Sequence, residues 1–464
     1  RPEIRLPVCA QNRARHPLQL ASTGLASVIT RLLTKFRPNL GSCGTPHNDL
    51  EVSLALCASA APTNKRSRPM LRTARRALLV GAAAVAAFDE HHALALERLA
   101  FGSCNKQQSP QPIWPVITNT THPQAWFWTG DAVYAAGKGA RAAKRALRAQ
   151  ADREDYAAFV STLDVVDGTW DDHDLGLNDA GQDEATDARR RAYAELFAKT
   201  DDAALHARRL ARYAARRGVY ASHAFGPPEK RVAVILLDTR SFRGAYRFPS
   251  LGAAARGVPV LGKLAPLAAA ALRGVAGMCG VGSPEDVLGE AQWAWLETQL
   301  AEAASARFVV VASSVQVLTS NPAFESWRHF PAAKARLLDA LRRHAPSGVL
   351  LLSGDVHHAD VSADSATTCG GAVEVTSSGL THSLASSKKT KLLFGPLLAT
   401  FTSHRPAPDA FYVGENYGEL AFAWGAAPEM RARVRDAAGR EVLSATVRSC
   451  PFGGGGDAGG GAGG

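Results

Sequence analysis

The sequence predicts an α/β fold, and two observations support this prediction. From about residue 97 onward, short apolar runs alternate with longer helical stretches, which is typical of strands joined by crossover helices. Several of the runs are continuously apolar rather than alternating, as expected for strands buried on both faces. The runs are Leu99–Phe101, Ala125–Trp128, Leu163–Val166, Val232–Leu237, Phe308–Val311, Val349–Leu352 and Val373–Val375.

Helices and a late hairpin complete the predicted fold. Asp187–Arg217 and Leu288–Ala304 are expected to be helical and to belong to the scaffold. Residues 252–282 are predicted to be an insertion that forms a surface lid or helical excursion, because their charges and prolines argue against a membrane span. An antiparallel hairpin is expected where apolar and polar residues alternate, at Leu420–Trp424, Met430–Val434 and Val442–Val447.

The composition is that of an ordinary globular protein. Of the 464 residues, 46% are hydrophobic and 20% are charged, and this length suits one large domain with insertions. The formal net charge is +11, of which residues 1–69 carry +7. A basic leader explains this excess, so no nucleic-acid partner is required. A monomer without a transmembrane anchor is expected.

The two ends of the chain are predicted to lie outside the folded domain. Residues 1–69 are expected to be disordered, or an upstream or transit-like extension. Residues 70–95 are predicted to be a signal peptide, because a basic segment, an apolar run and a small-residue motif follow one another there. Asp89 and Glu90 leave an amphipathic core helix as the alternative. A secreted, extracellular or endomembrane location is therefore expected, with a plastid as the alternative, and the Gly-rich residues 449–464 are expected to form a flexible tail.

Chemically active side chains directly follow several of the predicted strands. In open α/β sheets, ligands bind beyond the carboxyl ends of the strands. Five strand ends carry such side chains, namely Cys104–Asn105, Asp131 with Tyr134, Asp171–Asp174, Asp238 with Arg240, and Asp355–His358. We therefore expect these segments to meet at one site.

The Gly130-Asp131 pair has the features of a metal-bridging turn. A glycine after a strand lets the backbone turn sharply, so that the next carboxylate can bridge two cations. Tyr134 can return to the same site three residues later, and a phenolate favours ferric iron. On its own, this spacing more often marks a hydrogen-bonded turn, so its position after a strand carries the prediction.

Two further segments favour a metal centre over isolated polar groups. Asp355 and His357 share one face of an extended segment, which suits joint ligation, although an ion pair is the alternative; His358 points the other way and is expected to lie behind the ligands. Asp171–Asp174 places three carboxylates and an imidazole together. Their repulsion calls for a cation, with an exposed acidic loop as the alternative.

Other side chains can complete the site. Asn178 can add a neutral oxygen ligand, and Cys104 can bind a soft or ferric ion as a thiolate, although a lone cysteine is more often a buried small hydrophobe. Arg240 and Arg243 can clamp a phosphate, with a structural Asp–Arg pair as the alternative, and His382 can contact phosphate oxygens or donate a proton. The motifs of serine hydrolases, zincins and P-loop proteins are absent from the sequence.

Together these motifs resemble those of PhoD-type alkaline phosphatases, a branch of the calcineurin-like metallophosphoesterases related to purple acid phosphatases. Phe-Gly-Ser-Cys-Asn, Gly-Asp-x-x-Tyr, Trp-Asp-Asp-His-Asp, Leu-Asp-Thr-Arg-Ser-Phe-Arg, Leu-Gly-Glu-x-Gln-Trp-x-Trp-Leu, Ser-Ser-Val-Gln and Ser-Gly-Asp-Val-His-His occur in family order between about Leu96 and Tyr417. The resemblance implies a metallophosphoesterase domain at residues 96–448. Its implied fold is a four-layer sandwich of two mixed β-sheets packed face to face and flanked by helices.

The resemblance also implies a ligand set and cofactors. Ferric iron and calcium are the implied metals, with other divalent metals as alternatives. The residues matched to family ligands are Cys104 and Tyr134 for iron, Asp131 for the bridge, Asp355 and His357 as closing ligands, and Asp172 and Asn178 for calcium. The Gly-Asn-His-Glu motif of the wider superfamily is absent, and Asp171–Asp174 stands in its place.

The expected reaction is attack of a metal-bound hydroxide on a small-molecule phosphate ester. Arg240 or Arg243 would stabilise charge on the phosphoryl oxygens, and His173 or His382 would protonate the leaving group. A phosphodiesterase, nuclease or phospholipase of the same fold is one alternative. A non-catalytic module that binds phosphate or metal is the other.

Overall fold

The computed structural model describes residues 88–448 except 136–138, 198–199, 201, 249–260, 323, 345–348, 365–371, 387–391, 393–395 and 397. The described residues form two mixed β-sheets and the helices that cover them. The predictions for residues 1–87 and 449–464, and for the first part of the 252–282 insertion, lie outside the described residues.

An eight-stranded sheet has the strand order β1-β5-β6-β7-β8-β10-β9-β11. The strands are β1 (Glu90–His92), β5 (Ala221–Phe225), β6 (Val232–Leu236), β7 (Phe308–Ala312), β8 (Val349–Ser353), β9 (Ala359–Asp364), β10 (Ala372–Thr376) and β11 (Phe411–Tyr412). Four of the predicted apolar runs form its parallel centre, β6-β7-β8-β10. Their carboxyl ends therefore lie at one edge of the sheet.

A six-stranded sheet has the order β14-β13-β12-β2-β3-β4. The strands are β2 (Arg98–Gly102), β3 (Ala125–Thr129), β4 (Val165–Thr169), β12 (Asn416–Ala423), β13 (Glu429–Asp436) and β14 (Glu441–Arg448). The other three predicted runs form the parallel part β2-β3-β4, and the predicted hairpin is an antiparallel meander of three strands that pairs with β2.

Successive side chains of a strand point to opposite faces of its sheet and therefore enter different apolar cores. In β3, Phe127 joins an apolar core shared by both sheets, whereas Trp126 and Trp128 join a core on the other face. In β6, Val234 faces the shared core and Ile235 faces a third core. The two sheets therefore pack face to face, which confirms the predicted four-layer sandwich.

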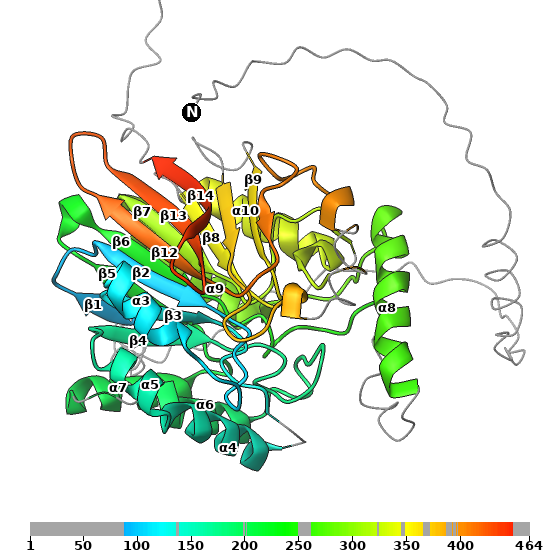
Figure 1. Cartoon of the computed structure of the whole chain (residues 1–464), viewed down its shortest axis with the longest axis horizontal. Helices are drawn as coiled ribbons and strands as arrows, with labels where there is room; N and C mark the ends of the chain where they lie inside the picture. Colours follow the sequence, from blue (N-terminus) through cyan, green and yellow to red (C-terminus); the bar gives the residue numbers. More distant parts are fainter. Residues whose placement is uncertain are drawn as a thin grey trace, which may run out of the picture. The chain divides into compact units, whose positions relative to one another are not determined.

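Helices cover the outer face of each sheet. Side chains of α3 to α7 join the core that contains Trp126, and those of α9 and α10 join the core that contains Ile235; Figure 1 shows α4 to α7 grouped near β4. The helices are α3 (Ile113–Thr121), α4 (Ala140–Ala151), α5 (Glu154–Val160), α6 (Asp187–Phe197), α7 (Ala203–Ala215), α8 (Leu261–Met278), α9 (Gly289–Glu302) and α10 (Pro331–His344). Short 3-10 turns occur at Pro228–Lys230, Ala303–Ser305, Trp327–His329 and Leu384–Ser386.

The structure differs from the sequence analysis at the helical stretch Asp187–Arg217, which is two helices rather than one. The carboxylate of Asp202 accepts hydrogen bonds from the backbone N–H groups of Ala204 and Leu205 and so begins α7. An aspartate in this position is a strong helix start. The helical part of the predicted insertion is α8.

Strand β1 lies within the segment that was predicted to be a signal peptide. Its residues pair in parallel with β5, and Glu90 is buried. A chain processed after Ala95 would lack this strand. Among the described residues, no helix has the length and apolarity that a membrane crossing requires.

Candidate metal centre

Loops from both sheets converge beyond the carboxyl ends of their parallel strands. The hydroxyl of Ser378, after β10, lies 3.1 Å from the sulfur of Cys104, after β2. The hydroxyl of Tyr134, after β3, lies 3.0 Å from Nε2 of His357, after β8. Side chains that are far apart in sequence therefore meet in one site, as the strand-end prediction requires.

Two glycines make this approach possible. Gly130 has φ +90°, and a Cβ on it would lie 2.5 Å from the Cβ of Asp171. A Cβ on Gly354 would lie 2.3 Å from Oγ of Ser103 and 2.6 Å from the carbonyl oxygen of Thr129. All three distances are shorter than real Cβ contacts, so only glycine fits where the two sheet ends touch.

Backbone strain is concentrated at the predicted ligands. Among the described residues other than glycine, six have a positive φ, and four of these are Cys104 (61°), Asp131 (48°), Asp355 (70°) and His357 (58°). A left-handed conformation costs such residues about 1–2 kcal/mol each. Strain of this kind persists where the surrounding structure holds a side chain in a functional position.

One group of ligand atoms combines sulfur, oxygen and nitrogen. The ligand atoms of Cys104, Asp131 and His357 all lie within 4.8 Å of one another, and Tyr134 adds its hydroxyl beside His357. Ser378 accepts a hydrogen bond from the backbone N–H of His357, at 2.8 Å, and is thereby held against Cys104. A set that includes a thiolate and a phenolate fits ferric iron.

A second group is made of carboxylates. The ligand atoms of Asp171, Asp172 and Asp355 lie within 4.8 Å of one another, as do those of Asp131, Asp172 and His173. Asp131 also belongs to the cluster that contains Cys104 and His357. Asp172 belongs to both of the clusters just described, the one with Asp171 and Asp355 and the one with Asp131 and His173. These two aspartates are therefore placed to bridge neighbouring cations.

The buried oxygens of this group fit hard cations. Oδ2 of Asp171 and Oδ1 of Asp172 are buried and have no hydrogen-bond partner among the described residues. An unpaired buried carboxylate oxygen is costly, and oxygen ligands are those that calcium prefers. The residues present therefore suit the metals that the sequence analysis expected.

Electrostatics supports the same conclusion. Burial raises the pKa of Asp131 and of Asp355 well above its ordinary value, and neighbouring carboxylates add to the shift. Burial also raises the pKa of Asp171 to about 7, although Arg240 opposes the shift. Burial lowers the pKa of His357 to about 3, so its imidazole is neutral and offers a lone pair. Cations would relieve the repulsion among these carboxylates.

Asn178 is placed differently from the expectation, because its side chain is exposed. The neighbouring Asp179 instead forms a group with Asp172 and Glu325, whose ligand atoms lie within 4.8 Å of one another. The backbone N–H of Asp179 donates to Oδ2 of Asp172 at 2.7 Å. Glu325 was missed because no recognisable motif surrounds it.

The two arginines occupy structural positions. Arg240 is fully buried, and its Nε and Nη1 donate hydrogen bonds to Asp171 and Glu325. Its Nη2 has no hydrogen-bond partner among the described residues and lies 4.0 Å from Oδ1 of Asp355. Arg243 is also buried and donates to the carbonyl groups of Asp179 and Ala180 at 2.6 and 2.9 Å. The structural alternative therefore describes both side chains better than a phosphate clamp does.

Partly exposed cationic and aromatic groups border the centre. The ring of Tyr134 stacks on His173 at 4.2 Å between centroids and lies 4.9 Å from His382. Lys106, which the sequence analysis missed, has its Nζ 5.5 Å from the centroid of the Tyr134 ring. In the sequence, only its position two residues after Cys104 indicates that Lys106 lies near the site. Lys106, His173 and His382 are all partly exposed, as are Tyr134 and His357 beside them.

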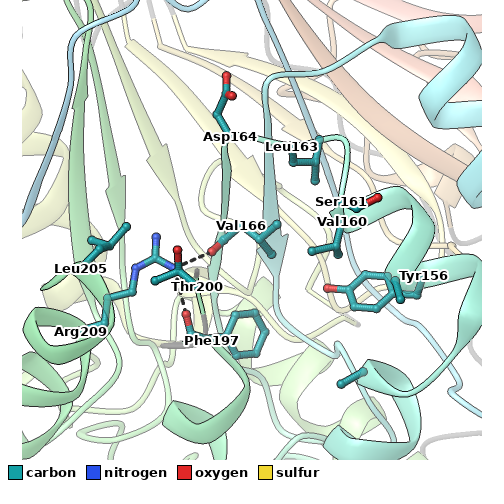
Figure 2. Close-up of a pocket in the computed structure, with 12 residues that line it drawn as sticks. Tyr156, Val160, Ser161, Leu163, Asp164, Val166, Phe197, Thr200, Leu205 and Arg209 are labelled. Carbon is teal, nitrogen blue, oxygen red and sulfur yellow. Dashed lines mark hydrogen bonds between the residues drawn. The ribbon is translucent and has the colours of Figure 1, made fainter. Parts of the chain in front are cut away.

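A cavity elsewhere takes no part in this centre. A cavity of about 470 Å³ is lined by residues of α5, β4 and α7, among them Tyr156, Val166 and Leu205. These side chains are labelled in Figure 2. None of the candidate ligands lines it. The chemistry of the metal centre is therefore assigned to the strand ends rather than to this cavity.

The chain matches one protein-family model and is similar to solved structures. The family model described as PhoD-like phosphatase matches residues 99–418. A solved structure described as PhoD has a TM-score of 0.51 and 14% identity and covers 78% of this chain and 73% of its own, which indicates a shared fold. GAP50, described as the anchor in the inner membrane complex of Plasmodium, has a TM-score of 0.42 and 13% identity, with 77% and 90% covered. No curated protein sequence matches the chain significantly.

Metal removal should make stability depend on pH. In the metal-free protein the pKa of Asp171 is raised to about 7 from 3.8, so folding takes up a proton between these values. A raised pKa stabilises the fold at low pH, and this contribution is lost as the pH rises through about 7. We expect the melting temperature of chelator-treated protein to fall between about pH 5 and about pH 8, and that of metal-loaded protein to change less. Parallel curves for the two forms would contradict the prediction.

Gly130→Ala should damage the centre more than a matched glycine substitution. Gly139 has a similar φ of +98° but open space around it, so Gly139→Ala isolates the backbone cost of about 1–2 kcal/mol. Gly130→Ala adds the collision with Asp171 and should lose further stability and bound metal. Denaturant unfolding and metal analysis of both variants measure the difference. Equal losses would show that the close approach at Gly130 is unimportant.

Proposed function

The chain belongs to the PhoD-like phosphatase family, and from this premise we propose that it hydrolyses small-molecule phosphate esters with the aid of metal ions. The observation that carries the proposal is the meeting of Cys104, Asp131, Tyr134 and His357 beside a group of buried carboxylates. Such a set has no structural use that apolar residues would not serve better, because buried charges cost free energy unless they are paired.

The proposed metals are ferric iron and calcium, with other divalent ions as alternatives for the carboxylate group. Cys104, Tyr134 and His357 would hold iron, Asp131 would bridge, and Asp171, Asp172 and Asp355 would hold calcium, with Asp179 in the place first given to Asn178. When bound, the cations would polarise the phosphoryl group and lower the pKa of the attacking water.

The protein's own groups bind and orient the ester. Lys106 carries a fixed positive charge at the border of the centre and would attract the dianionic phosphate. Arg240 would act as a positioning residue, because its ion pairs with Asp171 and Glu325 hold these two carboxylates in place. No direct contact between Arg240 and substrate is needed.

Proton transfer to the leaving group is assigned to His173 or His382. Both rings flank Tyr134 on the partly exposed side of the centre. Nε2 of His382 has no hydrogen-bond partner, and burial, with Lys106 and His173 nearby, lowers the pKa of this imidazole to about 3. A neutral imidazole has no second proton to give to a leaving group, so His173 is the preferred proton donor.

Asp131→Asn should abolish turnover while keeping the fold. An amide cannot bridge two cations as a carboxylate does, and a loss of several kcal/mol of transition-state stabilisation corresponds to a fall in kcat of at least about a hundredfold. Release of nitrophenol from nitrophenyl phosphate measures this, with Asp164→Asn as the control because Asp164 is exposed at the other end of β4. Near-normal activity in Asp131→Asn would exclude the bridging role, and wild-type protein without chelator-sensitive activity would favour a non-catalytic module.

Lys106→Ala should weaken substrate binding more than chemistry. Loss of one phosphate-directed charge should raise KM for a monoester by about tenfold, equivalent to about 1.4 kcal/mol, with a smaller effect on kcat. Lys106→Arg should restore most of the binding, and a singly charged diester should be less affected than the monoester. Steady-state kinetics on both esters checks this. An unchanged KM would remove Lys106 from the substrate site, and a diester preferred by wild-type protein would favour the phosphodiesterase alternative.

A further inference from the structure

A second cluster of metal-ligating side chains lies where the edges of the two sheets adjoin. Glu90 and His92 come from β1, the edge strand of the eight-stranded sheet, and His223 comes from β5 beside it. Asp167, on the edge strand β4 of the other sheet, contacts His223. None of these residues belongs to the metal centre described above. We propose that Glu90, His92 and His223 form a separate site for one divalent transition-metal ion of the zinc type.

The spacing of the three ligand atoms fits such an ion. Nε2 of His92 lies 3.2 Å from Nδ1 of His223. Oε2 of Glu90 lies 3.9 Å from the first of these nitrogens and 3.5 Å from the second. A point equidistant from three atoms so spaced lies about 2.1 Å from each, and zinc bonds to imidazole nitrogen and carboxylate oxygen measure roughly 2.0–2.2 Å. An ion at this point would replace the hydrogen bond between the two imidazoles, and the proton on Nε2 of His92 would move to Nδ1 or leave the ring.

The hydrogen bonds of His223 fix which of its nitrogens holds the lone pair that faces His92, whose Nε2 is hydrogen-bonded to it at 3.2 Å. Nε2 of His223 lies 3.1 Å from Oδ2 of Asp167, so in the neutral ring this nitrogen carries the proton and donates to the carboxylate. Nδ1 then holds the lone pair. Arg212 fixes Asp167 from the other side at 3.0 Å. A carboxylate behind a histidine in this way is the usual support for a metal-binding imidazole.

The carboxylate of Glu90 keeps one lone pair that accepts no hydrogen bond. Its oxygens accept from Nε and Nη2 of Arg209 at 2.7 and 2.8 Å and from Nη1 of Arg212 at 3.1 Å. A carboxylate has about four acceptor positions, so one remains on Oε2, the oxygen that faces both imidazoles. Figure 2 shows how Arg209 is itself held, through hydrogen bonds to the carbonyl groups of Val166 and Phe197.

The charge balance selects the type of metal. The carboxylates of Glu90 and Asp167 are matched by the guanidinium groups of Arg209 and Arg212. Affinity must therefore come from the two nitrogen donors rather than from excess negative charge. Imidazole suits zinc and similar transition ions, whereas calcium and magnesium require oxygen. This site should take zinc and reject calcium, in contrast to the carboxylate group of the metal centre.

The ion can enter from the surface beside His92. The side chain of His92 is 20% exposed, whereas that of His223 is fully buried. The bound ion would join β1 to β5 and would retain one coordination position for water.

A histidine pair on β1 provides the test. His92→Phe removes the ligand but retains the ring that stacks on Phe225 at 4.3 Å, and His91→Phe is the control because His91 is exposed on the next position of the same strand. The whole chain and each variant would be incubated with zinc chloride, passed through a desalting column and analysed by emission spectroscopy. We expect His92→Phe to lose about one equivalent of zinc relative to wild type, and His91→Phe to lose none.

Two further measurements separate this site from the phosphatase centre. Calcium content and nitrophenyl phosphate hydrolysis should be the same in His92→Phe, His91→Phe and wild type. In an Asp131→Asn background, which removes activity, the difference of one zinc equivalent between the two histidine variants should persist. Equal zinc content in His92→Phe and His91→Phe would overturn the proposal. So would a loss of zinc from His92→Phe that is matched by an equal gain in its calcium content. His92→Gln, which keeps a polar side chain, must reproduce the loss of zinc.

Discussion

The repulsion among carboxylates gathered at the junction of the two sheets is the constraint on which the rest of the structure depends. Asp131, Asp171, Asp172 and Asp174 are buried there, and Asp355 is partly buried beside them. Asp174 is satisfied by the backbone N–H groups of Val133 and Asp171, so it holds the loop. The other carboxylates require an opposite charge. Arg240 supplies only one, and we propose that bound cations supply the remainder.

The scaffold accepts further costs to keep these groups together. Four of the predicted ligands sit in left-handed backbone conformations, and glycines 130 and 354 leave no room for any other residue. Loops that were not anchored by packed strands would relax such strain. Its persistence indicates that the strand cores on either side fix the loops, and that the loops in turn fix the ligands.

Most of the fold and the identity of most candidate ligands could be predicted from the sequence, because both depend on local signals. Continuous apolar runs marked the central strands, and chemically active residues directly after them marked the site. Strand β1 was missed because its residues Glu90, His91 and His92 are polar, and because its partner strand β5 lies more than a hundred positions away. Asn178 and Asp179 could not be told apart either, because turn geometry decides which one faces Asp172. The burial of Arg240 depends on Glu325, which is 85 residues distant.

Anomalous X-ray scattering from crystals of protein loaded with iron and calcium would test the convergence of these ligands most directly. Data collected at the iron edge should show a peak within bonding distance of Cys104 Sγ, Tyr134 Oη, His357 Nε2 and an oxygen of Asp131. A calcium peak should lie among Asp171, Asp172 and Asp355. Peaks confined to other parts of the surface, or none in crystals that retain both metals, would contradict the assignment of this site.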